Sequence, residues 1–526
     1  MKRLLRPSLL ILLSVLLAVG AAVLVLGDRS GDAAPLPLGE NDQEIVWLYP
    51  AVSAANWERF VTAVNTAAEQ LAADHSDLRV QITEKAFPPQ TTAVPELALS
   101  VRRGAGRLVF RWYKLTSDLK TEQWVEKLVG GPRRPPLAVI GGASSDQAIE
   151  LAQSLNDSAG RSGAAAPPLL ILTTATADET QPLVSVPGQG AATGPGKLLT
   201  HLYRGRTCRF CFTNRQMARA VAGFIWSRDE LRPDTDPVYM AVWEDDSYSR
   251  DLIGQFSDAL RQPALTLAAA PEHWAGLLAG GCAGALLTET RLISRWIDFS
   301  VGGFDQPNRW EAQVAAELMS IKLRDHPKQE QPLLVLPAAA SGPARRFLRG
   351  MMRVAPAEAR RFVVATGDGL SFNTIYRDRN IAWPIQDLPF DLVFFCHRNP
   401  VDARARPAGS SSGTEDLLLY VDIVRAVVLA AYQGEDLPRS GDELRRRLGE
   451  ARWKDGGVSF APDGALLFDA DGNRRTGTGE HVVWLFPNIE GEQVLPRATI
   501  RVWSWPTWKK EADAQIDVEY EPSLGR

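Results

Sequence analysis

Two short apolar segments, 137–140 and 169–172, are each followed by small hydroxyl-bearing residues. The first segment precedes Ser144 and Ser145, and the second precedes the threonine cluster at 173–176. Two buried strands with a helical stretch between them are typical of a parallel sheet, and open α/β sheets bind ligands at the carboxyl ends of their strands. These segments therefore predict an α/β fold that binds a small polar molecule.

The remaining sequence alternates between strand-like and helical patterns, as expected for a parallel sheet with crossover helices. Strands are predicted at 45–49, 78–83, 108–112, 137–140, 169–172, 207–212, 238–243, 283–288, 332–336, 361–365, 391–395 and 482–486, and helices at 54–73, 119–129, 145–156, 214–229, 248–261, 343–353 and 417–431. Gly- and Pro-containing segments at 180–197 and 399–415 are predicted to be exposed loops.

Composition and charge exclude several classes of function. Of 526 residues, 45% are hydrophobic and the net charge is -4, which fits a globular protein of two or three cores and gives no reason to expect nucleic acid. The six histidines are scattered without metal-ligand spacing, and no phosphate loop or nucleophile elbow is present. We therefore expect no metal, no cofactor and no enzymatic activity.

The four cysteines are too few for a disulfide framework in so long a chain. Cys208 and Cys211 are three apart in a strand-like segment, so their side chains should point to opposite faces and should not share a metal ion. We expect all four, including Cys282 and Cys396, to be buried as small apolar side chains.

The amino terminus differs from the globular part. Lys2, Arg3 and Arg6 precede an uncharged run at 8–26, which is close to the length of about 20 residues that spans a bilayer. This pattern predicts a cytoplasmic end at 1–7, a transmembrane anchor at 8–26 with the bulk of the chain exported, and a linker at 27–43. A cleaved signal peptide is the alternative.

Four motifs in this order carry a resemblance to a known family. They are Gly141-Gly-Ala-Ser-Ser145, Thr173-Thr-Ala-Thr-Ala177, Trp243-Glu-Asp-Asp-Ser-Tyr-Ser-Arg-Asp251 and Phe468-Asp-Ala-Asp-Gly-Asn473. The chain resembles the type I periplasmic binding proteins, such as the leucine/isoleucine/valine-binding components of ABC transporters, over about 44–490.

The resemblance implies two doubly wound, Rossmann-like α/β lobes joined by three crossing strands, with a ligand cleft between the lobes. Lobe 1 would take residues 44–213 and 370–460, and lobe 2 would take residues 214–369 and 461–526. Two segments, 86–106 and 180–197, would be loop insertions relative to the family.

The resemblance also implies a ligand site in the first lobe. Ser144 and Ser145 would hold a ligand carboxylate near the start of the following helix, where backbone amides add partial positive charge. Ala175 and Thr176 would face the ligand's amino group through a carbonyl and a hydroxyl. The alternative is that the serines only cap the helix and the threonines only end a strand.

Two further residues complete the implied site. Tyr248 would close over the ligand from the second lobe, and Asp368 would pair with its ammonium group. Alternatively, Tyr248 packs at a helix start and Asp368, between two glycines, belongs to a turn. Because the polar segment 369–378 beside Asp368 departs from the family pattern, the ligand's identity stays open.

Three functions remain from these observations. The first is an exported, membrane-tethered solute-binding protein that captures an amino acid-like ligand and delivers it to an ABC permease. The second is a sensory or scaffold ectodomain with an altered or lost ligand site and a membrane signalling partner. The third is a hydrolase built from Ser144, Asp368 and His397, which the absence of a nucleophile motif disfavours.

Overall fold

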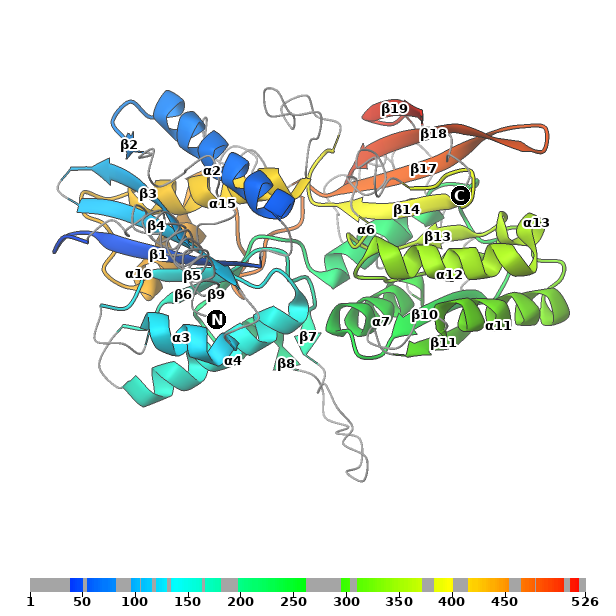
Figure 1. Ribbon diagram of the computed structural model, residues 1–526, viewed down its shortest axis with the longest axis horizontal. Helices are drawn as coiled ribbons and strands as arrows, with labels where there is room; N and C mark the ends of the chain where they lie inside the picture. Colours follow the sequence, from blue (N-terminus) through cyan, green and yellow to red (C-terminus); the bar gives the residue numbers. More distant parts are fainter. Residues whose placement is uncertain are drawn as a thin grey trace, which may run out of the picture.

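The computed structural model contains two α/β lobes, each built on one sheet (Figure 1). The structure describes residues 38–50, 54–81, 96–104, 106–115, 120–129, 134–162, 166–180, 197–261, 295–302, 310–370, 383–400, 415–453, 465–477, 479–505 and 511–519. The expected anchor at 8–26 and the expected strand at 283–288 lie outside these residues.

The sheet of the first lobe has the order β2-β3-β4-β1-β5-β6-β9. Its strands are β1 Gln43–Pro50, β2 Arg79–Gln81, β3 Glu96–Arg103, β4 Gly106–Leu115, β5 Ala138–Gly141, β6 Leu169–Leu172 and β9 Thr207–Arg209. Strands β2, β4, β1, β5, β6 and β9 run in one direction, and β3 runs antiparallel to both of its neighbours, β2 and β4. Strands β5 and β6 are short runs buried along their whole length, as interior parallel strands usually are.

Helices cover both faces of this sheet. They are α2 Ala54–Asp74, α3 Thr121–Val129, α4 Ser145–Ser162, α5 Leu199–Leu202, α15 Glu415–Ala431 and α16 Gly441–Glu450. One core includes side chains of α2, α15 and α16, and the other includes side chains of α3, α4 and α5. The first lobe is therefore doubly wound, although α15 and α16 come from the far end of the sequence.

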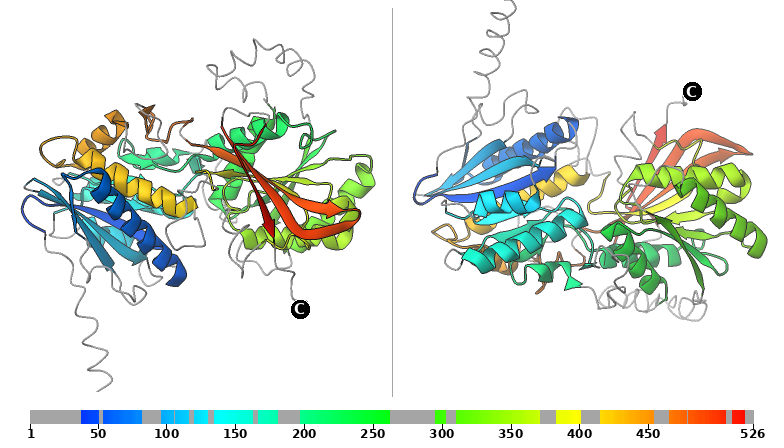
Figure 2. Two further views of the ribbon diagram at one scale, coloured as in Figure 1. Left: turned by 90° about the horizontal axis from the view of Figure 1, so that it is seen from above. Right: turned by 60° about the horizontal axis from the view of Figure 1, so that its bottom comes forward.

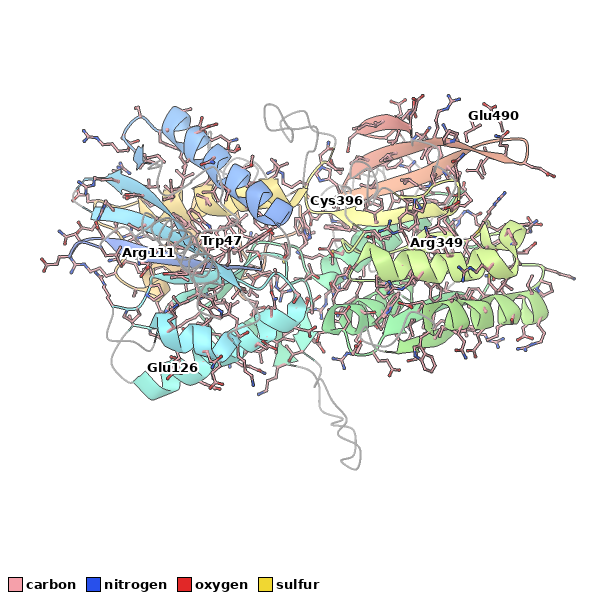
Figure 3. All side chains as sticks on the ribbon, in the orientation of Figure 1. Trp47, Arg111, Glu126, Arg349, Cys396 and Glu490 are labelled. Atoms are coloured by element: carbon pink, nitrogen blue, oxygen red, sulfur yellow. The ribbon has the colours of Figure 1, made fainter. Side chains whose placement is uncertain are left out.

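The sheet of the second lobe has the order β11-β10-β12-β13-β14-β17-β18-β19. Its strands are β10 Val238–Trp243, β11 Trp296–Gly302, β12 Leu333–Val335, β13 Val363–Ala365, β14 Asp391–Cys396, β17 His481–Glu490, β18 Gln493–Ser504 and β19 Ala514–Glu519. Strands β10 to β14 are parallel, and the last three add an antiparallel extension. Glu490 lies at the outer end of the β17–β18 hairpin (Figure 3).

Helices also cover both faces of the second sheet (Figure 2). They are α6 Asn214–Trp226 and α7 Ser247–Arg261 on one face, and α11 Trp310–Asp325, α12 Ser341–Val354 and α13 Pro356–Ala359 on the other. A capping box fixes the start of α6, since the Thr213 hydroxyl accepts from the Gln216 amide and the Gln216 side chain accepts from the Thr213 amide. Two small two-stranded sheets pair β7 Glu179–Thr180 with β8 Lys197–Leu198, and β15 Arg452–Trp453 with β16 Ala465–Leu466.

The chain crosses between the lobes three times. It passes from β9 into α6, then from Cys396 at the end of β14 toward α15, and finally from Asn473, which pairs with Arg209, into β17. Figure 3 shows Cys396 between the two lobes. Two doubly wound lobes with three crossings match the expected architecture.

The boundaries of the lobes differ from the expected ones. Residues 370–460 were assigned to the first lobe, but β14 lies in the second sheet, where it pairs with β13 and β17. Leu467 and Phe468, assigned to the second lobe, belong to a core of the first. The second and third crossings therefore come later in the chain, because a strand's own sequence does not specify the sheet in which it pairs.

The structure corrects one predicted loop and confirms the predicted burial of three cysteines. The segment 86–106 was expected to be an insertion loop, which is wrong for Glu96–Arg103, because these residues form β3 against β4. Cys208, Cys211 and Cys396 are buried and unbridged, as expected, whereas Cys282 lies outside the described residues.

Candidate functional site

The loops that follow β5 and β6 lie beside one another where the two lobes meet. Gly141 at the end of β5 pairs with Leu172 at the end of β6, so the two hydroxyl-rich loops leave the sheet at the same edge. We call this region the lobe junction: it comprises residues 141–145 and 173–180 of the first lobe, the starts of α6 and α7, and Asp368 with His397.

The two first-lobe loops are bonded to each other. The Ser145 hydroxyl accepts a hydrogen bond from the Ala177 amide at 3.2 Å, and the Thr174 hydroxyl donates to the Ala143 carbonyl at 2.8 Å. Ser144 is exposed and its hydroxyl accepts from the Gln147 amide at 3.3 Å, which is a helix cap. Ser145 is thus committed to the loop structure, whereas Ser144 remains at the surface.

Ala175 and Thr176 are buried beneath these loops. The Ala175 carbonyl accepts from the Cys211 thiol at 3.2 Å, and the Thr176 carbonyl accepts from the Asn214 amide at 2.7 Å. The exposed fraction is 0% for Ala175 and 1% for Thr176. The Thr176 hydroxyl oxygen is buried and has no hydrogen-bond partner among the described residues.

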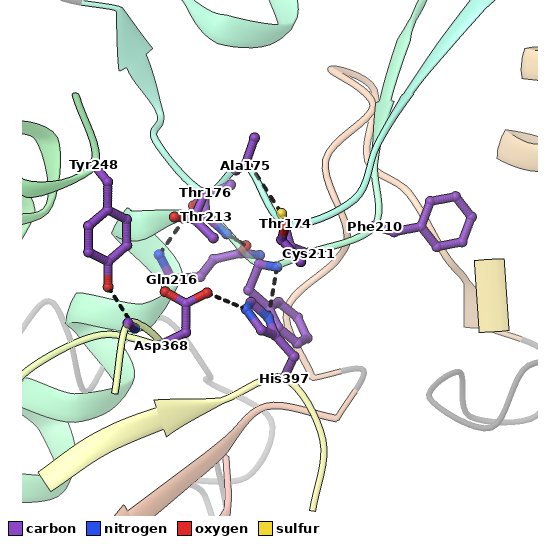
Figure 4. Close-up of polar contacts among 12 residues, drawn as sticks. Thr174, Ala175, Thr176, Phe210, Cys211, Thr213, Gln216, Tyr248, Asp368 and His397 are labelled. Atoms are coloured by element: carbon purple, nitrogen blue, oxygen red, sulfur yellow. Dashed lines mark hydrogen bonds and ion pairs between the residues drawn. The ribbon is translucent and has the colours of Figure 1, made fainter. Parts of the chain in front are cut away.

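Tyr248 lies across from these residues, in the first turn of α7 (Figure 4). Its hydroxyl accepts from the Gly369 amide at 3.2 Å. A Cβ atom at Gly367 would come within 2.5 Å of the Tyr248 hydroxyl oxygen, so glycine is needed for this ring position. Burial raises the pKa of Tyr248 well above its usual value, and the Asp368 carboxylate adds to the effect, so the phenol stays protonated.

Asp368 is bonded to His397. The Asp368 Oδ2 atom lies 2.8 Å from His397 Nε2, and His397 Nδ1 accepts from the Phe212 amide at 3.3 Å. Because an amide can only donate, Nδ1 carries no proton and Nε2 donates to Asp368. The imidazole ring stacks on Phe212 at a centroid distance of 5.8 Å, so residues of the first and second crossings hold the Asp368 carboxylate in place.

This geometry does not form the hydrolase relay. Both His397 ring nitrogens have partners, Asp368 and the Phe212 amide, and the Ser144 hydroxyl bonds to the Gln147 amide. A serine nucleophile requires a hydrogen bond to the base that takes its proton.

Asp251, which was not predicted from the sequence, accepts two interlobe hydrogen bonds at the junction. Its carboxylate, on α7, accepts from the Asp178 amide at 2.8 Å and the Glu179 amide at 3.3 Å, both in the first lobe. It also accepts from the Asn214 side chain at 2.8 Å. Asp251 is three residues after Tyr248 in a predicted helix, so the same helix face was a signal that could have found it.

Burial shapes the electrostatics of this contact. Burial raises the pKa of Asp251, and the nearby Asp178 carboxylate raises it further, while the amides that it accepts from act in the opposite direction. Asp178 is held in turn by the Arg215 amide at 2.7 Å. The first-lobe loop is thus fixed to the amino-terminal ends of α6 and α7.

Metal-binding clusters and membrane-spanning helices are both absent from the described part of the chain. The residues that the structure describes contain no group of three or more His, Cys, Asp or Glu side chains arranged to hold a metal ion. Within the same residues, no helix combines the length and the apolar character needed to cross a bilayer.

No protein-family model and no curated protein matches the sequence. Solved structures do match. The branched-chain amino acid transporter substrate-binding protein LivJ from Streptococcus pneumoniae, in complex with isoleucine, is 13% identical, with 88% of this chain and 99% of that chain covered and a TM-score of 0.49. The leucine-, isoleucine-, valine-, threonine- and alanine-binding protein from Brucella ovis is 10% identical, with 91% and 94% covered and a TM-score of 0.49.

A third match is the solute-binding protein of an ABC transporter from Rhodopseudomonas palustris in complex with 3,4-dihydroxybenzoic acid. It is 10% identical, with 92% of this chain and 99% of that chain covered and a TM-score of 0.48. The two-lobed α/β architecture of this chain rests on its own sheets and crossings.

Proposed function

We propose that the chain is a two-lobed binding protein that takes a small, polar, amino acid-like ligand at the lobe junction. One observation carries this proposal: Asp368 is a partly exposed carboxylate whose His397 partner donates from a neutral ring. Among the described residues, no Lys or Arg forms an ion pair with it. A ligand ammonium group would supply the missing positive charge.

In this proposal the other end of the ligand meets the first lobe. Ser144 is exposed at the start of α4, where the partial positive charge of the helix amino terminus favours a carboxylate. Thr176 contributes a buried hydroxyl that has no hydrogen-bond partner within the described ranges, and Ala175 and Ser145 shape the floor of the site. Tyr248 lines the side of the second lobe, and the three crossings permit hinge closure around the ligand.

We further propose that residues 8–26 anchor the exported protein in the inner membrane, and that an ABC permease is the partner. The positive charges of Lys2, Arg3 and Arg6 support a cytoplasmic amino terminus. Membrane fractionation of the intact chain should leave it in the pellet after a high-salt wash. Recovery of a soluble product that begins near residue 30 would contradict the anchor.

A second candidate function is a sensory or scaffold ectodomain without a working ligand site. It is favoured because several expected ligand contacts have partners within the chain: the Ser145 hydroxyl bonds to Ala177, the Ala175 carbonyl to Cys211 and the Tyr248 hydroxyl to Gly369. A ligand would have to replace these hydrogen bonds, which makes its net free energy of binding less favourable.

A thermal-shift screen of the exported part separates the two candidates. We expect an amino acid or related small acid to raise the melting temperature, since a ligand at 100 times its Kd adds about 2.7 kcal/mol to the stability. Asp368→Asn should abolish the shift. Asp157→Asn, an exposed position in α4, is the matched control and should retain it. No stabiliser among amino acids, peptides and aromatic acids would favour the second candidate.

A further inference from the structure

A cavity of about 540 Å³ lies on the first lobe, within the size range of small-molecule sites. It is lined by one side of α16, by the start of β9 and by the turn at 468–475, and we call it the α16 cavity. None of its lining residues belongs to the lobe junction.

Arg445 distinguishes this cavity from an ordinary surface hollow. It is the first of three consecutive arginines in α16, and the other two have acidic partners one helical turn away: Arg446 pairs with Glu450, and Arg447 with Glu443. Arg445 has glycine at both equivalent positions, Gly441 and Gly449. It forms no ion pair with a described residue.

The hydrogen bonds of Arg445 are also incomplete. One terminal nitrogen, Nη2, donates to the Ala470 carbonyl at 3.2 Å, and the guanidinium lies against the Cys208 thiol. The Nε atom is buried and has no acceptor among the described residues. A buried donor without an acceptor costs about 1 to 3 kcal/mol, so an acceptor supplied by a ligand would be favoured.

Three carboxylates also line the cavity, those of Asp442, Glu450 and Asp469, and among the described residues none of them forms an ion pair with Arg445. Asp442 pairs with Arg206, and the Asp469 carboxylate accepts from the Asn473 amide at 2.8 Å. Burial raises the pKa of Cys208 to about 12, so its thiol carries no negative charge at neutral pH. Arg475 also lines the cavity, and its Nε atom donates to the Phe468 carbonyl at 3.2 Å.

No close packing contact requires glycine at position 449. A Cβ atom there would meet nothing within 4 Å, whereas one at Gly441 would come 2.3 Å from the Leu169 amide nitrogen. Glycine in a helix costs about 0.5 to 1 kcal/mol relative to alanine. Gly449 therefore leaves space open beside Arg445 at a cost in helix stability.

We propose that the α16 cavity binds a small molecule that bears an oxyanion, either a carboxylate or a phosphate, with Arg445 as its main ligand and Arg475 as a second donor. A guanidinium fits either group because it presents two parallel N–H donors. This site is separate from the proposed amino acid-like site at the lobe junction and does not depend on it.

Calorimetric titration of the intact protein with inorganic phosphate and with citrate, at constant ionic strength, tests the proposal and distinguishes the two sources of oxyanion. We expect at least one of the probes to bind, and Arg445→Gln to weaken that binding by about 10-fold or more, since hydrogen bonds to charged groups contribute about 1.5 to 3 kcal/mol. Arg349→Gln is the matched control, because Arg349 is exposed on α12 of the second lobe and does not line the cavity. It should change affinity by less than about 2-fold.

A second variant keeps the arginine. Gly449→Glu places a carboxylate one turn from Arg445 and should abolish anion binding while the melting temperature confirms an intact fold. Failure of wild type to bind either probe, or unchanged binding in both Arg445→Gln and Gly449→Glu, would overturn the proposal. Asp368→Asn should leave phosphate or citrate binding intact, so a failure at the lobe junction is distinguishable from a failure here.

Discussion

The lobe junction and the α16 cavity both contain charged groups, but those groups find their partners differently. At the junction the Asp251 carboxylate accepts amides of the opposite lobe, and Asp368 holds His397. In the cavity Arg445 forms no ion pair with a described residue, and its Nε atom has no acceptor within the same part of the chain. A ligand proposed for the junction would exchange existing hydrogen bonds, whereas one proposed for the cavity would supply a missing acceptor, so the two regions should respond differently to mutation.

The largest expected loss of stability comes from a change at Gly472, in the turn that lines the α16 cavity. Gly472 has φ +82°, and a Cβ atom there would lie 2.2 Å from the Thr207 carbonyl oxygen. Gly472→Ala should lower the free energy of unfolding by about 3 kcal/mol or more, because the left-handed conformation alone costs about 1 to 2 kcal/mol. Urea unfolding measures this.

Gly477 provides the control for Gly472. Its φ is +83°, but a Cβ atom there would meet nothing within 4 Å. Gly477→Ala should therefore cost only the conformational part, about 1 to 2 kcal/mol. Equal losses in the two variants would mean that the close approach to β9 does not fix the cavity wall.

The next effect concerns the junction. Asp251→Ala removes the acceptor of the Asp178 and Glu179 amides and of the Asn214 side chain. We expect the free energy of unfolding to fall by about 2 to 3 kcal/mol, since buried donors are left unpaired. Asp258→Ala, exposed on the same helix, should change it by less than about 0.5 kcal/mol. A loss that matched the control would show that the lobes are not held together by these bonds.

A smaller effect depends on pH. Burial raises the pKa of Asp246 at the start of α7 to about 6, the Ser249 amide opposes the shift, and the Asp146 carboxylate reinforces it. Because the folded pKa lies above the unfolded value, the ionised group destabilises the fold. Its unfavourable contribution is absent below about pH 4 and grows as the pH rises through about 6.

Asp246→Asn isolates this contribution while keeping a good helix cap. Relative to the variant, the free energy of unfolding of the wild type should fall by on the order of 2 kcal/mol between pH 4 and pH 7. The measurement is denaturant unfolding of both proteins across this range. A constant difference would show that the carboxyl is not buried at the junction.

The smallest expected effect is a gain in stability. Gly449→Ala should stabilise the protein by about 0.5 to 1 kcal/mol, because alanine favours the helix and its Cβ atom meets nothing. Thermal unfolding measures the change. A destabilised variant would indicate that Gly449 has a packing role after all, which would weaken the contrast between the cavity and the junction.

The sequence predicted local elements better than their partners. The strand at 169–172 coincides with β6 because a short apolar run between polar loops has few alternatives. Strand β3 was missed because its sequence mixes charged and apolar residues, and its stability comes from pairing with β4. Strand β14 was recognised, but not the sheet to which it belongs.

The same limit applies to the candidate site. The two hydroxyl-rich loops were correctly expected to be neighbours, because the ends of parallel strands lie at one edge. The bonds of the Ser145 hydroxyl to Ala177 and of Asp368 to His397 depend on angles and distances that only the assembled lobes determine. Asp251 was overlooked because a carboxylate in a helix usually faces solvent, although it shares a helix face with Tyr248.

The pairing of Asn473 with Arg209 has a consequence for biosynthesis. The β9 edge of the first sheet stays uncovered while the whole second lobe up to β14 is translated, since its covering segment is made only afterwards. An uncovered edge strand is a template for pairing with other chains. During synthesis this edge is protected by its short length, since β9 has only three residues, and it gains the pairing with Asn473 only after most of the chain has been made.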